Sequence, residues 1–189
     1  FNDVTAHLRA ACERWGLIWL EQESVILQGV RFLGCTLWTD FDALNGDSLS
    51  ASLSGRDKAF RAANYYLRKN HSLRGGLPIL APEVRELGLQ SQAWLRKALA
   101  SPFYGLTTVV THFAPSLLSA DPRYGLTAGT AGFCNALDDL LPAAQLWLHG
   151  HLHCPQDYVS QGCHVVANPL GYAHKGEQKS YRPDLLIQI

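Results

Sequence analysis

The segment Trp147-Leu-His-Gly-His-Leu-His153 carries histidines at alternate positions, His149, His151 and His153, between apolar residues. Imidazole is the commonest metal-binding side chain, and its neutral nitrogen suits zinc, iron and manganese. In an extended strand these rings would be spaced by about 6.6 to 7 Å along one face, too far apart for one ion. Gly150 permits a sharp turn as the strand ends. We therefore predict a metal site in a loop at the carboxyl end of a buried strand. The alternative is a strand whose histidines only bond to one another or to solvent.

A second segment, Thr107-Thr-Val-Val-Thr-His-Phe-Ala-Pro-Ser116, repeats this arrangement. An apolar strand ends at His112, and Pro115 turns the chain into a loop directly afterwards. A single histidine in such a place is usually a hydrogen-bonded core residue. Together with the later cluster, His112 becomes a fourth candidate ligand.

Length and composition place the chain among globular proteins. The 189 residues predict a single domain, 47% of them are hydrophobic, and 16 basic residues balance 16 acidic ones. This balance predicts no nucleic-acid or membrane surface and favours a small or locally recognised substrate. Because no apolar run reaches about 18 residues and no signal peptide opens the chain, we expect a cytoplasmic protein. Five scattered cysteines predict reduced thiols rather than disulfides.

The remaining patterns predict alternating strands and helices. We expect helices up to Trp15 and over 56–69, 82–87, 91–99 and 133–141, and strands over 17–20, 25–27, 30–37, 107–112, 145–148, 157–160, 163–167 and 185–189. The first helix should pack its apolar face on a core. Loops are expected over 74–78, 119–132 and 168–172. The loop 38–47 either covers a substrate cleft or is a connection whose Trp38 and Phe41 cap the core.

In combination these motifs resemble a known family. Val109-Val-Thr-His-Phe-Ala-Pro-Ser116, Leu148-His-Gly-His-Leu-His153 and Asn168-Pro-Leu-Gly-Tyr172 are similar, in this order, to the later motifs of calcineurin-like metallophosphoesterases. Gly29-Val-Arg-Phe-Leu-Gly-Cys-Thr-Leu-Trp38 resembles the mid-chain hairpin of bacterial members. The resemblance covers nearly the whole chain. It implies a layered α-β-β-α sandwich, an α/β fold.

The resemblance also implies residue roles. His112 and His151 would bind one metal ion, and His153 the other. His149 would support the site, while Asn168 and Gly171 would shape its floor. The chemistry implied is hydrolysis of a phosphate mono- or diester by a metal-activated hydroxide, with two divalent ions of manganese, iron or zinc. Phe113 departs from the second histidine often found at its position, which removes a polar substrate contact.

The family's earlier motifs, Asp-x-His, Gly-Asp and Gly-Asn-His-Glu, are not in this sequence. They carry the bridging aspartate and the histidine that assists the leaving group. The chain also begins at Phe1 and contains no methionine. We therefore predict that residues 1–189 are a domain lacking its N-terminal strands, with slight or no activity alone. Apolar surface left without a partner should then pair with the missing segment or with a second copy.

Two other functions remain open at this stage. One is a non-catalytic scaffold or interaction module of the same fold, although such a module does not need His112, His151 and His153. The other is a mononuclear zinc hydrolase or structural zinc site that uses the histidine cluster. Metal stoichiometry separates the three, with two ions for the family, one for the zinc protein and none for the scaffold.

Overall fold

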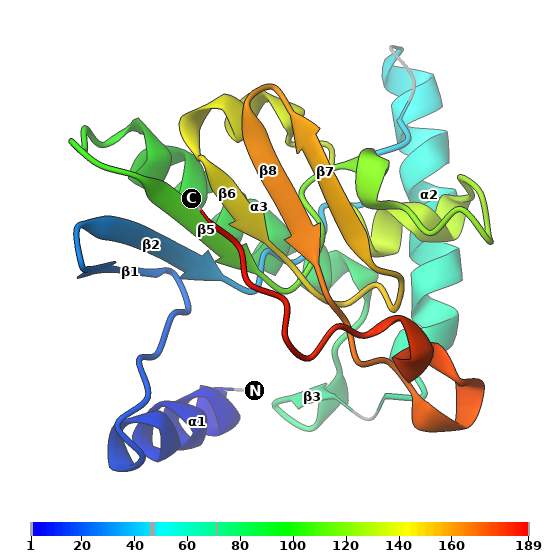
Figure 1. Cartoon of the computed structure of the whole chain (residues 1–189). Coiled ribbons are helices and arrows are strands. Elements are labelled where there is room, and N and C mark those ends of the chain that lie inside the picture. The colour runs from blue at the N-terminus through cyan, green and yellow to red at the C-terminus, as the bar shows by residue number, and fades with distance from the viewer. Residues whose placement is uncertain (1, 46–47, 71, 189) are drawn as a thin grey trace.

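The computed structural model describes residues 2–45, 48–70 and 72–188, and within them six strands form one mixed sheet (Figure 1). The strand order is β1-β2-β5-β6-β8-β7. Its inner strands β2, β5, β6 and β8 are parallel, and β1 and β7 pair antiparallel at the two edges. The bounds are β1 (Glu23–Leu27), β2 (Val30–Cys35), β5 (Thr107–Thr111), β6 (Leu146–Leu148), β7 (Gln156–Ser160) and β8 (Cys163–Ala167).

Both edge strands belong to tight hairpins, as the sequence predicted. Gln28 and Gly29 join β1 to β2 with φ of 50° and 81°, and Gln161 and Gly162 join β7 to β8 with φ of 49° and 83°. Two consecutive residues with positive φ match the twist of the flanking strands. These turns fix the register of both hairpins.

The main hydrophobic core lies between the sheet and the helix α3 (Ala81–Ala100). Leu95 of α3 packs with Leu33, Val109, Trp147 and Val165, which come from the four parallel strands. In Figure 1, α3 lies behind the sheet. Alternate residues of the strands therefore face this helix, and they position the carboxyl ends of the strands.

A second, smaller core surrounds the helix α2 (Leu49–Leu67), which packs on α3 and on the 3₁₀ helix η2 (Ala128–Gly132). Phe41 is buried in this core, and its ring meets that of Phe60 edge to face at 5.1 Å. The other short elements are β3 (Leu73–Arg74), β4 (Leu77–Pro78), η1 (Leu117–Ser119), η3 (Asp138–Ala143), η4 (Ala173–Lys175) and η5 (Glu177–Ser180).

Several expected elements differ in the structure. The segments 82–87 and 91–99 belong to the single helix α3, and 74–78 contributes to the small hairpin β3–β4 rather than to a loop. Residues 133–141 are not an α-helix, because Asn135 bonds through its amide N–H and its side chain to Ala114 O, and Pro142 lies within η3.

Two predicted strands are also wrong. Residues 17–20 form no ladder, because β1 and β5 already occupy both edges of β2. Residues 185–188 form none either, and residue 189 lies outside the described part of the chain. Asn168 instead holds this tail in a loop through two hydrogen bonds with the Arg182 backbone.

The helix α1 (Asn2–Arg14) is present, but the prediction that it packs on a core is wrong. Val4, Leu8 and Trp15 are exposed, with Trp15 at 71%, and Figure 1 shows the helix set apart from the sheet. The chain therefore presents an apolar surface here. Its pairing with another segment or a second copy stays a prediction.

The observed class is a mixed α/β fold with α3 on one face of the large sheet. The four-layered sandwich stays a prediction, since the described residues contain one large sheet. No helix among these residues has the length and apolar character needed to cross a bilayer. All five cysteines are free, as expected.

Candidate metal centre

His112 and the histidine cluster lie at the same edge of the sheet. His112 follows β5 directly, and His149 follows β6, the neighbouring parallel strand. The two histidine segments are joined through their backbones, because the amide of Gly150 donates to His112 O at 3.1 Å. The amide of His112 in turn donates to Thr36 O, directly after β2, at 3.2 Å. Carboxyl ends of parallel strands are where binding sites of open α/β sheets occur.

The structure brings His112 and His151 into contact. Nε2 of His112 lies 3.1 Å from Nδ1 of His151, and the ring centroids are 4.9 Å apart. Two imidazole nitrogens bound to one ion at about 2.0 to 2.1 Å, with tetrahedral or octahedral angles, lie roughly 2.9 to 3.4 Å apart. The two nitrogens therefore already have the spacing of two ligands of one metal ion.

Both imidazoles are held in the uncharged form that binds metals. Burial, with the nearby charge of His112 and His153, lowers the pKa of His151 to about 4. Burial, with the charge of His153, also lowers the pKa of His112. A metal ligand must be a neutral imidazole, so both rings offer lone pairs at neutral pH.

The sharp turn after β6 is made by His151 rather than by Gly150. His151 has a φ of 62°, whereas Gly150 is not among the residues with positive φ. The amide of Leu152 donates to Gly150 O at 2.7 Å across His151, which closes a three-residue turn. A turn of this kind with positive φ is rare and strained, and strain at a non-glycine residue often marks a functional position.

His153 points to a different partner. Its Nδ1 lies 2.8 Å from Oε2 of Glu177, and the same oxygen accepts the amide of Tyr172 at 2.7 Å. This amide bond, with the bond to His153, lowers the pKa of Glu177. The carboxylate therefore accepts Nδ1–H of His153 and leaves Nε2 as the free lone pair, the arrangement common for metal-bound histidines.

Gly171 allows this contact with Glu177. It has a φ of 66°, and a Cβ built there would lie 2.5 Å from Cβ of Glu177. Only glycine fits such a close approach in the left-handed region. Gly171 thus lies against the partner of His153, and its part in shaping the floor of the site stays a prediction. The sequence analysis missed Glu177, because no motif links it to His153.

His149 is buried behind the site and binds no other histidine directly. Its Nδ1 lies 3.2 Å from Gly150 O and its Nε2 lies 3.0 Å from Ser119 Oγ, which in turn lies 2.8 Å from the Tyr158 hydroxyl. The carbonyl can only accept, so Nδ1 carries the proton and Nε2 accepts from the serine. This chain of bonds fits a supporting role for His149.

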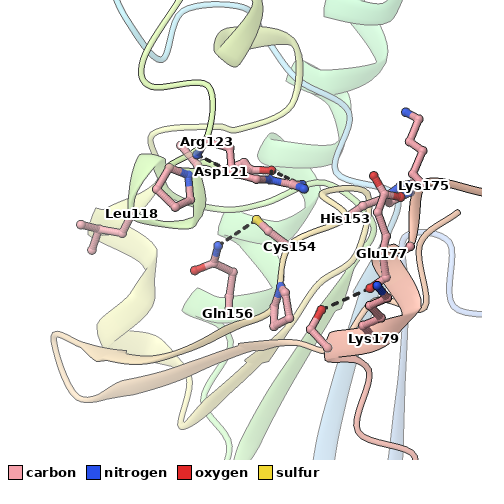
Figure 2. A pocket seen from close by; sticks show the side chains of 14 residues that line it. Leu118, Asp121, Arg123, His153, Cys154, Gln156, Lys175, Glu177 and Lys179 are labelled. Carbon is pink, nitrogen blue, oxygen red and sulfur yellow. Dashed lines mark hydrogen bonds and ion pairs between the residues drawn. The ribbon is translucent and has the colours of Figure 1, made fainter.

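His153 and Glu177 line an open pocket of about 670 Å³ (Figure 2). Arg123, Lys175 and Lys179 also line it, together with Asp121, so three cations and two carboxylates surround this pocket. His112 and His151 instead line a second pocket of about 300 Å³. His112 and His151 therefore share one pocket, and His153 lines another.

Within the described residues, no group of three or more His, Cys, Asp or Glu side chains is arranged to hold a metal ion. The pair His112–His151 fits two positions of one ion, and His153 fits one position of another. Both positions need further donors. Asn168, expected at the floor of the site, bonds instead to the backbone of Arg182.

Comparisons with known proteins give a fold but no family. No family model matches the chain. The uncharacterized protein L509 of Acanthamoeba polyphaga mimivirus is 24% identical over 197 residues, which cover all of this chain and 66% of that protein. The crystal structure of phosphopantetheinyl hydrolase (PptH) from Mycobacterium tuberculosis matches 97% of this chain and 69% of its own, with a TM-score of 0.62 and 16% identity. The chain shares that fold and spans just under two thirds of the curated relative.

Proposed function

We propose that this chain belongs to a metal-dependent phosphoester hydrolase and supplies the histidine half of a dinuclear site. The observation that carries the proposal is the 3.1 Å separation between His112 Nε2 and His151 Nδ1. The shared fold with an enzyme named as a phosphopantetheinyl hydrolase supports hydrolysis of a phosphate ester. The substrate itself, a mono- or diester, stays open.

Each histidine has a defined part in this proposal. His112 and His151 would hold one divalent ion through the two nitrogens that face each other, Nε2 and Nδ1. His153 would hold the second ion through Nε2, which faces away from Glu177. Bound manganese, iron or zinc would supply positive charge to the phosphoryl oxygens and lower the pKa of a water molecule. The further ligands that the resemblance implies lie in motifs absent from this sequence.

The protein's own cations would bind the phosphate. Arg123, Lys175 and Lys179 line the pocket that contains His153. Arg123 is also paired with Asp121 at 2.6 Å, so its charge is partly balanced. The two lysines are therefore the groups that would attract and orient the anionic substrate, because ammonium groups bind phosphate oxygens as point charges.

Metal occupancy of single variants tests the assignment. The longest natural form of the protein that contains this chain, dialysed against zinc or manganese and measured by elemental analysis, should lose the same ion in His112→Ala and His151→Ala. His153→Ala should affect a different ion, and His149→Ala should have a smaller effect. His7→Ala is the matched control, because His7 is an exposed histidine on α1. Unchanged occupancy in all three ligand variants would exclude the assignment.

Stoichiometry and activity separate the alternatives. The longest natural form of the protein that contains this chain should bind two ions and hydrolyse a generic aryl phosphate, with loss of activity on chelation. One ion would indicate a mononuclear zinc protein, and none a scaffold. Residues 1–189 alone should show little or no hydrolysis.

A further inference from the structure

The pocket of about 300 Å³ beside His112 and His151 has an aromatic lining. We call it the aromatic pocket. Its rings come from four separate segments of the chain, which are the loop after β2, the helix α2, the end of β5 and the segment after η2. They are Trp38, Phe41, Tyr66, Phe113 and Phe133.

The chemistry of the lining selects for an uncharged group. Among the described residues that line the pocket, none is Asp, Glu, Lys or Arg, and apart from the two histidines the polar side chains are Tyr66, Asn70 and Ser72. A charged ligand would lose its hydration here without gaining an ionic partner. An apolar group would instead gain the burial of its surface.

The pocket shares a wall with the candidate metal ligands. The ring centroid of His151 lies 4.1 Å from that of Phe113 and 5.3 Å from that of Phe133, and the interplanar angles are 33° and 36°. The ring centroid of Phe113 also lies 5.4 Å from that of His112 and 5.4 Å from that of Trp38. A group bound in the pocket would therefore lie beside any ion held by the two histidines.

Phe113 is the residue that makes this wall apolar. The residue is only 6% exposed and lies between Trp38 and the histidine pair. Phe113 therefore gives the pocket an aromatic surface directly beside the two histidines.

We propose that the aromatic pocket binds the organic group of the phosphate ester, and that this group is apolar and planar. This inference rests on the proposed function. At about 30 Å³ for each water-sized unit, the cavity has room for roughly ten such units, which suits one or two fused rings. The substrates would be phosphate esters of an aromatic or similarly apolar alcohol, rather than of a sugar.

Binding of two probes tests the pocket and the metal site separately. 2-Naphthol tests the pocket alone in the presence of EDTA, and (naphthylmethyl)phosphonate tests the pocket together with the metal site in the presence of zinc. Methylphosphonate is the reference without the ring. Titration calorimetry should show at least tenfold tighter binding of the naphthyl phosphonate than of methylphosphonate, and naphthol should bind without metal.

Variants of α2 locate the binding. Ala62→Phe places a ring into the pocket without altering a histidine, and it should weaken naphthol and naphthyl phosphonate binding at least tenfold. Ala51→Phe is the matched control, since Ala51 lies on the same helix and does not line the pocket. It should bind both probes as the parent does. If Ala62→Phe does not fold, Tyr66→Ser, at a 59% exposed lining position, should weaken both probes instead.

Two results would overturn the inference. One is the absence of naphthol binding, or binding that Ala62→Phe and Tyr66→Ser leave unchanged, which would exclude the aromatic pocket as the site. The other is naphthol binding in the pocket with no gain from zinc and phosphonate. In that case the pocket would be an apolar binding site unconnected with phosphoester chemistry. The proposed function would then fail as well. Metal occupancy should be the same in Ala62→Phe and the parent.

Discussion

His153 and Glu177 are joined by a 2.8 Å contact between Nδ1 and Oε2, although 24 residues separate them in sequence. Glu177→Gln preserves the shape of the side chain but removes its charge. Because a carboxylate partner orients the imidazole and raises its basicity, we expect about 10- to 100-fold weaker binding of the metal that depends on His153. Competitive titration against a chromophoric chelator measures this affinity. Glu86→Gln, at an exposed position of α3, is the control.

Gly171→Ala should weaken the binding of the same metal ion, because it displaces Glu177 instead of changing its charge. The new Cβ would meet Cβ of Glu177 at 2.5 Å, and the residue would keep a φ of 66°. Glu177 must then shift away from His153. The same chelator titration checks this variant, and an unchanged metal affinity in Gly171→Ala would show that the contact between His153 and Glu177 does not orient the ring.

The positive φ of His151 predicts an unusual order of stabilities. Any residue with a Cβ is strained at φ of 62°, and glycine is not. His151→Gly should therefore be more stable to urea unfolding than His151→Ala by about 1 to 2 kcal/mol. Both variants should lose the same metal ion. Equal stabilities of the two variants would mean that the turn after β6 lacks the left-handed residue.

Asp42 predicts a pH-dependent stability. Burial opposes its ionisation, but hydrogen bonds from Arg56 at 2.6 Å and Arg85 at 2.7 Å outweigh that effect and lower its pKa below 3.8. A carboxyl group whose pKa is lower in the folded chain than in the unfolded chain stabilises the fold at a pH above its unfolded-state pKa. This stabilisation is lost as the pH falls through its folded-state pKa. Asp42→Asn should cost about 2 to 3 kcal/mol at pH 7.

The cost of Asp42→Asn should shrink as the pH falls below about 3.8, the ordinary aspartate value. Urea unfolding of parent and variant at pH 7 and pH 3 measures both differences. Asp57→Asn, at an exposed position on α2, is the control. A cost independent of pH would mean that the two arginines do not stabilise the ionised form.

Gly88 lies within α3, where the sequence predicted a break between two helices, and there the helix packs closely against the backbone of Trp38 and Thr39. A Cβ there would lie 2.6 Å from Thr39 O and 2.7 Å from Trp38 O. Alanine favours a helix by up to about 1 kcal/mol over glycine, but overpacking against backbone costs roughly 1 to 3 kcal/mol. Gly88→Ala should therefore lower the thermal midpoint, whereas Gln90→Ala, which is exposed on the same helix, should not. A rise in the midpoint would contradict the close approach.

The sequence predicted the elements whose signals are local. Gln28-Gly29 and Gln161-Gly162 fixed two hairpins, and the apolar runs before His112 and His149 gave neighbouring strands of one sheet. The pairing of β5 with β6 then brings His112 to His151. Convergence of these two rings could be expected from sequence, because both follow strands that end at one edge.

Features set by contacts distant in sequence could not be predicted. Glu177 approaches His153 only because Gly171 adopts a left-handed φ, and no periodicity encodes that approach. The exposure of Leu8 on α1 and of Trp15 directly after it depends on what the helix packs against, not on its amphipathic pattern. The sharp turn after β6 was expected at Gly150 from its lack of a side chain, whereas the residue with positive φ is His151.

Anomalous scattering from crystals grown with zinc tests the central claim most directly. The account predicts a zinc peak bridging His112 Nε2 and His151 Nδ1, about 2.0 to 2.1 Å from each nitrogen, with the two nitrogens still close to their present separation of 3.1 Å. Zinc bound elsewhere on the protein, with no peak between these nitrogens, would show that the pair is a hydrogen bond rather than part of a metal site.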